Sequence, residues 1–456
     1  MIAVLSLAVG IVLADSAIVT LALPEILRQL DAEVSEVAWV LTAYNLVLAL
    51  AAVPAARLCI KPGHAPVAGA AGLVVFAGAS AGCAAATSLE VLIVARVVQA
   101  LGGALVIMAC LELLVLASGD ERRGAARWAV AGVAGAAVGP VAGGLLTQAI
   151  SWQSIFIFQV PLVLLAVPVA IRLRGRSRAA GATVADSVRA ADRPDAAANL
   201  ALALLSAALT AALFLLVLLL VEGWRRSPAL AAITVTVIPV AAIAAGVVAR
   251  AARAGTRSEA IAGAILIGGG LVALGFLPDA NPAWTLAPQA LVGLGLGLTV
   301  DSLTAVALRD RFPRALHGGW TIAARHVGVV AGLAILTPIF TADLRDAQAP
   351  AQEAIAALVL DAPLPASAKL DLADGLGREL ESEGGRVPDL APAFSAVRLD
   401  AADRPRAQAL AVALDDQLER AATRAFRDAF LVAGALALLA VLPASMLRET
   451  RPEAGA

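Results

Sequence analysis

The stretch from Leu13 to Pro24 reads L-A-D-S-A-I-V-T-L-A-L-P, an almost entirely apolar segment that carries one charge, Asp15. It closes an apolar run over residues 2–24, which is long enough to cross a bilayer as one helix of about 20 residues. The run has no basic leader and no clear cleavage site, so it is interpreted as a span and not as a signal peptide. Its abrupt start leaves room for a short cytoplasmic leader ahead of it.

Eleven further runs of the same kind follow along the chain. Of the 456 residues, 60% are hydrophobic and 15% are charged, whereas soluble domains have about 45–50% apolar and about 25% charged residues. The runs are continuous and lack the alternation of a barrel strand, so all are predicted to be transmembrane helices. The twelve predicted spans are 2–24, 36–56, 66–86, 90–116, 126–149, 154–171, 198–221, 229–249, 260–277, 284–308, 318–341 and 429–447.

Side chains that carry chemistry are few. The chain has three Cys and three His, too scattered for a disulfide framework or a metal site. No nucleophile and base fall together in the pattern that catalysis needs. The formal net charge of −1 excludes a broad basic surface for nucleic acid. We therefore expect no enzymatic activity, no catalytic residues, no cofactor, no metal and no nucleic-acid partner.

The distribution of Lys and Arg predicts the orientation in the membrane, because cytoplasmic loops carry the excess of these residues. With the N-terminus inside, the cytoplasmic loops and the tail hold about nineteen Lys and Arg residues, and the short outer loops hold about three. We therefore expect both termini in the cytoplasm of a multi-pass protein of the cell membrane.

Two hydrophilic stretches divide the chain into five parts. An Arg-rich cytoplasmic linker, 173–197, separates an N-terminal bundle of six helices, 1–172, from the first five helices of a C-terminal bundle, 198–341. A long outer segment, 342–425, precedes the last helix and the cytoplasmic tail, 426–456. The predicted fold is an all-α integral membrane protein with two pseudo-symmetric six-helix bundles and a helical extracytoplasmic insertion.

The outer segment contains about fifteen acidic and nine basic residues. Within it, residues 403–424 are predicted to form an amphipathic helix, with one apolar face made by Leu410, Leu414, Leu418 and Ala421. We interpret the segment as a small helical cap on the outer mouth; a module that recruits a partner is the alternative.

Two opposite charges lie at similar depth in the first and fourth spans. At 1.5 Å per residue, Asp15 lies about 13 Å and Arg96 about 10 Å inside the outer boundary. A charge in the bilayer core costs at least about 2.5–3.5 kcal/mol, so each needs a partner. Gln99 shares a helix face with Arg96, and Tyr44 and Asn45 have comparable depth. We expect a polar cluster that faces an aqueous cavity; a static ion pair is the alternative.

The tenth and eleventh spans carry a second pair, Asp301 and Arg325, each about 12 Å from the inner boundary. His326 follows Arg325 but points in a different direction on a helix. A structural ion pair and a role in the cavity both remain possible interpretations of this pair.

Three motifs resemble the multidrug:proton antiporter branch of the major facilitator superfamily. Leu13 to Pro24 resembles the first-span signature, which implies that Asp15 is the intramembrane acid of that branch. A-R-V-V-Q-A-L-G-G-A from Ala95 to Ala104 resembles the fourth-span motif, which gives Arg96 a role in proton transfer. G-A-A-V-G-P-V-A-G-G resembles the fifth-span antiporter motif, in which glycines allow close helix contact and proline allows bending. We expect five of its residues to shape the contact between the bundles: Gly135, Gly139, Pro140, Gly143 and Gly144.

Two features depart from the family. The loop after the second span reads A-R-L-C-I-K-P-G-H-A, with Ile60 where the family has an Asp. Most relatives of this branch have fourteen spans, two more than are predicted here.

Together these patterns predict a proton-coupled exporter of small lipophilic compounds that works by alternating access. Its expected partners are the lipid bilayer, a small-molecule substrate and protons, and we expect a monomer. An uptake symporter is the alternative within transport, and a transport-inactive receptor or scaffold of the same fold is the alternative outside it.

Overall fold

The computed structural model describes residues 1–180, 192–252, 255–309, 311–382, 390–397, 400 and 402–449. Within these residues all regular structure is helical, and twelve helices are long and apolar enough to cross a membrane. The predicted all-α membrane fold with twelve spans is thereby confirmed. The middle of the predicted linker, 181–191, lies outside the described residues.

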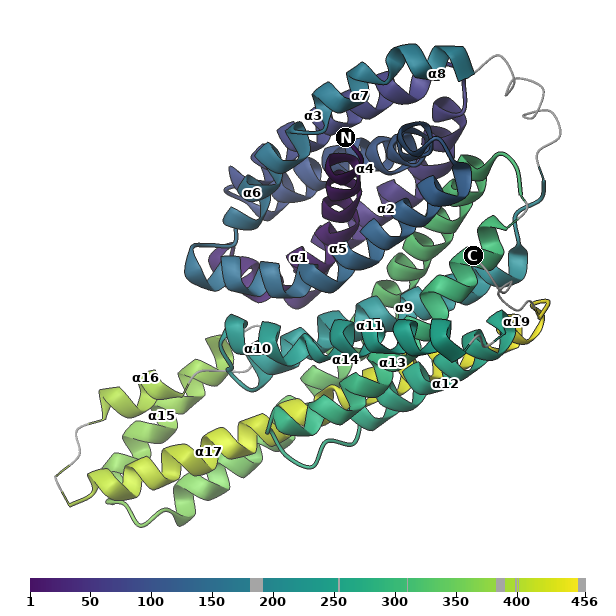
Figure 1. The fold of residues 1–456 in the computed structure, drawn as a ribbon. Helices are drawn as coiled ribbons and strands as arrows, with labels where there is room; N and C mark the ends of the chain where they lie inside the picture. The colour runs from purple at the N-terminus through teal and green to yellow at the C-terminus, as the bar shows by residue number, and fades with distance from the viewer. Residues whose placement is uncertain are drawn as a thin grey trace.

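The first group of helices contains six spans and the start of the linker. The sixth span is broken near Pro168, which lacks an amide hydrogen and lies at the start of α7. The elements are α1 (Ile2–Gln29), α2 (Val34–Cys59), α3 (His64–Ala84), α4 (Leu89–Ser118), α5 (Glu121–Ala149), α6 (Ser154–Leu164), α7 (Val167–Arg172) and α8 (Arg174–Ala180). Figure 1 shows this group, in purple and blue, beside the second group.

The second group also provides six spans. Its first span ends in a π-helical turn, η2, and its second and last spans are each made of two short helices. The elements are α9 (Ala196–Leu218), η2 (Leu219–Gly223), α10 (Pro228–Val235), α11 (Val237–Ala252), α12 (Thr256–Leu274), α13 (Ala283–Leu308), α14 (Arg314–Asp361), α18 (Arg427–Leu439) and α19 (Val441–Ser445).

The outer segment projects beyond the spans (Figure 1). Helix α14 continues without a break for 48 residues and ends shortly before Pro363. Together with α15 (Ala366–Ser382), α16 (Ala391–Ala396) and α17 (Arg404–Ala425) it surrounds a small apolar core of its own. The prediction of a cap on the outer mouth is therefore wrong, because the eleventh span carries its helix out of the bundle.

The amphipathic helix predicted over 403–424 is confirmed as α17. Its buried face contains Leu410, Leu414 and Leu418, and Ala422 instead of the expected Ala421 completes it. Helix α17 runs on to α18 with one residue, Phe426, between them, so the outer segment and the last span form one nearly continuous rod.

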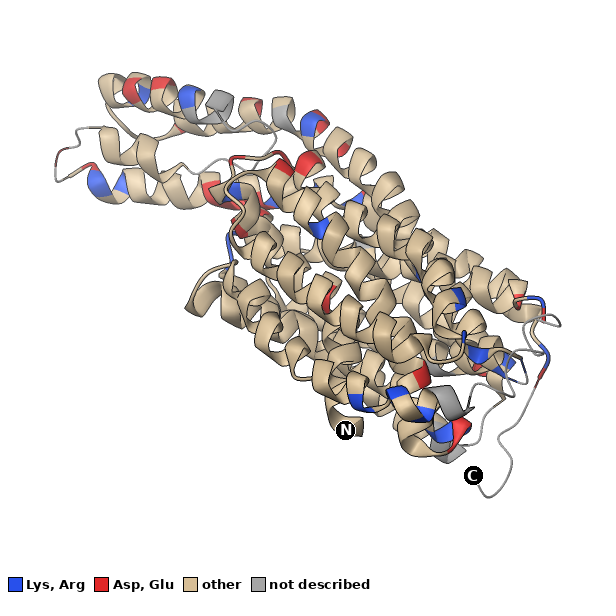
Figure 2. Ribbon diagram, turned by 90° about the horizontal axis from the view of Figure 1, so that it is seen from above, with Lys and Arg blue, Asp and Glu red and all other residues tan. Residues whose placement is uncertain are grey.

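Charged residues separate along the spans (Figure 2). Lys and Arg gather at the end of the bundle near both termini, which we call the terminus side. Asp and Glu gather at the opposite end, where the outer segment begins, which we call the extension side.

Candidate functional site

Asp15 of α1 and Arg96 of α4 form an ion pair inside the N-terminal bundle. Arg96 Nη1 donates to Asp15 Oδ2, and both side chains are completely buried. A charge without a partner at this depth is strongly unfavourable, whereas a paired and hydrogen-bonded one is tolerated. The two residues that depth alone predicted to be neighbours are in direct contact.

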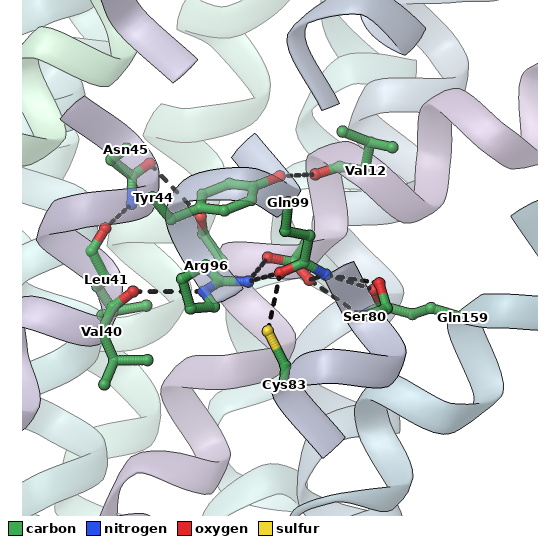
Figure 3. A network of polar contacts seen from close by, with 12 residues as sticks. Val12, Val40, Leu41, Tyr44, Asn45, Ser80, Cys83, Arg96, Gln99 and Gln159 are labelled. Carbon is green, nitrogen blue, oxygen red and sulfur yellow. Dashed lines mark hydrogen bonds and ion pairs between the residues drawn. The ribbon is translucent and has the colours of Figure 1, made fainter. Parts of the chain in front are cut away.

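Amide side chains complete the shell around this ion pair (Figure 3). Gln159 of α6 donates to Asp15 Oδ1 over 3.0 Å, and Gln99 accepts from Arg96 over 2.7 Å. Gln99 Nε2 donates to Ser80 over 2.8 Å and also lies 3.3 Å from Asp15 Oδ1. Every described polar contact of Asp15 is with a donor, so both of its carboxyl oxygens accept hydrogen bonds.

Tyr44 of α2 covers the cation. The centre of its ring lies 3.9 Å from the Arg96 guanidinium carbon, a cation–π contact. Its hydroxyl donates to the Val12 carbonyl oxygen over 3.2 Å, and Arg96 Nε donates to the Val40 carbonyl oxygen over 3.3 Å. Arg96 is thus held from α1, α2 and α4, and one of its nitrogens, Nη2, has no partner among the described residues.

Asn45, the next residue on α2, joins the two bundles. Its Nδ2 donates to the Leu41 carbonyl oxygen over 2.7 Å, which fixes the orientation of the amide. Its Oδ1 lies 2.6 Å from His326 Nδ1 of α14 and 3.4 Å from Ser16 Oγ of α1. The neighbours Asp15 and Ser16 therefore take part in two different polar groups, one buried and one that connects the bundles.

A large cavity lies between the bundles, with a volume of about 1250 Å³. Its walls are mostly apolar and come from α1, α2 and α5 of the N-terminal bundle and from α9 to α14 of the C-terminal bundle. Its polar lining includes Ser16, Thr20, Asn45, Gln289, Arg325 and His326, together with hydroxyl groups of α9 and α13.

The ion pair does not line this cavity. Asp15, Arg96, Gln99, Tyr44 and Asn45 are all buried, and of these five only Asn45 contributes to the cavity wall. The expectation that the whole cluster faces the cavity is wrong in this conformation, because α1 and α2 direct alternate neighbours to opposite sides of the wall.

The cavity opens on the terminus side. Its wall there contains the exposed residues Arg122 and Arg309. At the extension side the bundles meet: Arg28 of α1 lies 3.8 Å from Glu222 of η2, and Gln148 of α5 accepts from the Ala229 amide of α10 over 2.6 Å.

The predicted role of the antiporter-motif glycines needs correction. A Cβ on Gly135, Gly139 or Gly143 would meet the backbone of α1, within the same bundle. Only Gly144 faces the other bundle, where a Cβ would meet Ala232 of α10, and Pro140 lines the cavity. Close helix contact is therefore present, but three of the four glycines serve the packing of α5 on α1.

The second predicted pair remains untested. The side chain of Asp301 lies outside the described residues. Arg325 is half-buried on the cavity wall, and within the described part of the chain it makes no ion pair.

Sequence reasoning missed Gln159, Ser80 and Gln289. Each is a polar residue inside an apolar run, and this signal could have identified all three. His326 and Asn45 were both identified from the sequence, but their contact was not predicted, because the two residues belong to different bundles.

Twelve spanning helices around a central cavity define a multi-pass membrane protein of the transporter type. A sequence model described as Major Facilitator Superfamily matches residues 5–336. The chain belongs to the major facilitator superfamily, and its outer segment after residue 341 lies beyond the matched part.

Several curated relatives are similar over part of the chain. The identity is 36% over 169 residues with the tetracenomycin C resistance and export protein of Streptomyces glaucescens, covering 36% of this chain and 31% of that one. It is 35% over 175 residues with the methylenomycin A resistance protein of Bacillus subtilis, covering 37% of each. It is 33% over 181 residues with the multidrug efflux pump LfrA of Mycolicibacterium smegmatis, covering 39% and 35%. The matched part spans about a third of these relatives.

Solved structures share the fold. A bacterial homologue of the human lysosomal transporter Spinster, in an inward-facing and unoccupied conformation, has a TM-score of 0.60 at 13% identity and covers 97% of this chain and 96% of its own. The xylose transporter XylE from E. coli has the same TM-score and identity and covers 74% and 90%. At this identity the similarity concerns the fold alone.

Proposed function

We propose that the protein is a proton-coupled exporter of small lipophilic compounds in the cell membrane, which works as a monomer by alternating access. The observation that carries this proposal is the position of Asp15. It is the buried partner of Arg96, and the next residue, Ser16, lies in the wall of the central cavity. A proton-binding group and a substrate cavity therefore share one helix turn.

The chemistry follows from the shell of donors around Asp15. Arg stays charged at all relevant pH values, so the protonation of Asp15 would leave Arg96 without its counter-ion and place a new O–H group among donors. That state favours a rearrangement of α1 against α4. An inward proton gains about 2.3 kcal/mol per 100 mV, and this energy drives export only if each conformation favours a different occupancy.

The orientation follows from the charges. We assign the terminus side to the cytoplasm, because this side carries the excess of Lys and Arg (Figure 2). The cavity then opens to the cytoplasm, where an exporter loads its substrate. Both termini lie inside, and the outer segment lies outside the cell.

The mostly apolar walls support lipophilic substrates. The names of the relatives support efflux: two of them are named for resistance to an antibiotic, and one is named a multidrug efflux pump. We infer efflux from these names together with the cavity. We infer membership of the multidrug:proton antiporter branch, and proton coupling, from the Asp15–Arg96 pair.

Transport in reconstituted vesicles tests this function. The purified full chain is placed in vesicles with an imposed pH gradient, and tetracenomycin C, methylenomycin A and ethidium serve as probes. Uptake of a probe into inverted vesicles with simultaneous release of protons supports the proposal, and Asp15→Asn should abolish this uptake while the protein still inserts and folds.

Other results of the same experiment identify the alternatives. Movement of probe and protons in the same direction indicates a symporter. Binding of a probe without any flux indicates a receptor or scaffold. Full transport by Asp15→Asn contradicts the assigned role of Asp15, whereas the control variant Glu90→Gln, at the exposed start of α4, should transport normally.

A further inference from the structure

The cavity wall contains a buried carbonyl oxygen that has no partner. Gln289 of α13 is fully buried, and its Nε2 donates to Thr285 Oγ1 over 2.8 Å. The Thr285 hydroxyl donates in turn to the Pro282 carbonyl oxygen over 2.7 Å, so it must accept from Gln289. The amide orientation is thereby fixed, and Gln289 Oε1 is left without a hydrogen bond among the described residues. A buried acceptor without a hydrogen bond is unfavourable, because it has lost its contact with water and gained none in return.

The second acceptor is Nε2 of His326 on α14, and the contact of His326 with Asn45 of α2 shows why this nitrogen accepts. Asn45 Oδ1 can only accept, because Asn45 Nδ2 already donates to Leu41. The nitrogen that faces it over 2.6 Å, His326 Nδ1, must therefore carry a hydrogen. In a neutral imidazole the other nitrogen is then an acceptor. His326 is half-buried and lines the cavity, and no described residue binds its Nε2.

We propose that His326 and Gln289 are two separate acceptors in the cavity wall for the hydrogen-bond donors of a lipophilic ligand, each taking one hydroxyl group of a phenol. Asn45 is the positioning residue: it holds His326 in the tautomer whose Nε2 accepts. This inference rests on the proposed function, of which it specifies the substrate class.

The chemistry of the wall explains the selectivity. An apolar wall binds any lipophilic molecule of suitable size, so its area alone does not distinguish a phenol from its methyl ether. An acceptor that is already desolvated does distinguish them, because only the phenol satisfies it. The ether leaves the acceptor unmet and brings a further oxygen close to it.

The tautomer can be tested without transport. The chain has three His, so NMR of the full chain with isotope-labelled histidine gives three sets of ring nitrogens, and His326→Gln assigns one of them. We expect a protonated Nδ1 and an unprotonated Nε2 in His326, and a change toward the other tautomer in Asn45→Leu. A protonated Nε2 in the unaltered protein overturns the proposal.

Ligand recognition is tested with naphthol and its methyl ether as probes. Naphthol should shift the Nε2 resonance of His326, and the ether should not. A neutral hydrogen bond contributes about 0.5–1.5 kcal/mol, and naphthol has a single O–H to donate, which the Nε2 shift would assign to His326. His326→Phe should therefore weaken naphthol binding about threefold to tenfold and leave ether binding unchanged, and Gln289→Leu should do the same for a dihydroxynaphthalene compared with its dimethyl ether. Equal effects on both probes, or no binding of naphthol, overturn the proposal.

A control variant separates this effect from general damage to α14. Thr321 lies on the same helix, and its hydroxyl donates to the His317 carbonyl oxygen over 3.0 Å. Thr321→Val should bind both probes as the unaltered protein does. Binding of naphthol through His326 without proton-driven flux would contradict the proposed function but support this site. Flux without a preference for the donor would contradict this site alone.

Discussion

No side-chain carbon fits between Gly135 of α5 and the carbonyl oxygen of Gly10 in α1. A Cβ on Gly135 would meet the oxygen, the carbonyl carbon and the Cα of Gly10. Backbone therefore lies on backbone at this point, and α5 can approach α1 only because both positions lack a side chain.

Gly135→Ala should destabilise the protein by about 1–3 kcal/mol, the usual cost of overpacking, seen as a lower Tm in detergent. Gly78→Ala is the matched control, because a Cβ there meets nothing within 4 Å. It should be neutral or more stable by up to about 1 kcal/mol, since alanine favours the helix. Equal effects of the two substitutions would contradict the packing of α5 on α1.

Asp15→Asn should cost about 3–5 kcal/mol in the free energy of unfolding, because it leaves the buried Arg96 without a counter-ion. The double variant Asp15→Asn with Arg96→Gln removes both charges and should regain most of that loss. Thermal unfolding in detergent measures both. A double variant less stable than the single one would show that Arg96 is held mainly by other groups.

The outer segment should loosen when its anchor is removed. Trp224, a fully buried residue that follows η2, donates from Nε1 to Thr423 Oγ1 of α17 over 2.8 Å. Trp224→Phe and Thr423→Val should each cost about 1 kcal/mol and speed the cleavage of α17 by an added protease. The double variant should be only slightly less stable than either single variant, because each single substitution already removes the hydrogen bond. If the two losses of stability add fully, the bond contributes nothing.

A cross-link at the extension side should stop transport. Gln148 and Ala229 are in contact between the bundles, and the native cysteines are buried: Cys59, Cys83 and Cys110. A short reducible linker between Gln148→Cys and Ala229→Cys should hold this side closed, and reduction should restore flux. Gln148→Cys alone, treated in the same way, is the control. Unchanged flux in the linked protein would mean that the two bundles need not separate here.

The spans could be predicted because an apolar run of membrane length has one favourable structure in lipid. The Asp15–Arg96 pair could be predicted for a related reason: two costly charges at one depth stabilise each other. Neither argument needs the positions of other helices.

The other features of the fold and of the site depend on the positions of neighbouring helices. The direction of the Gly135 face, toward α1 instead of the other bundle, is set by which helices are neighbours, and one sequence does not contain that information. The contact between Asn45 and His326 exists only in a conformation that brings α2 against α14. The sequence after residue 341 predicted a helical segment. It did not predict that the eleventh span, α14, would continue into this segment without a turn.

The length of α14 has a mechanical consequence. Its 48 residues measure about 72 Å at 1.5 Å per residue, more than twice the roughly 30 Å of a hydrocarbon core. One end carries Arg325 and His326 in the cavity wall, and the other reaches Asp361, far from the bilayer. When a bundle rotates, the part of a helix farthest from the rotation axis moves the most. Under the proposed alternating access, a small rotation of the C-terminal bundle should therefore displace the outer end of α14 more than the cavity wall, and a spectroscopic label at the exposed Leu360 would measure this displacement.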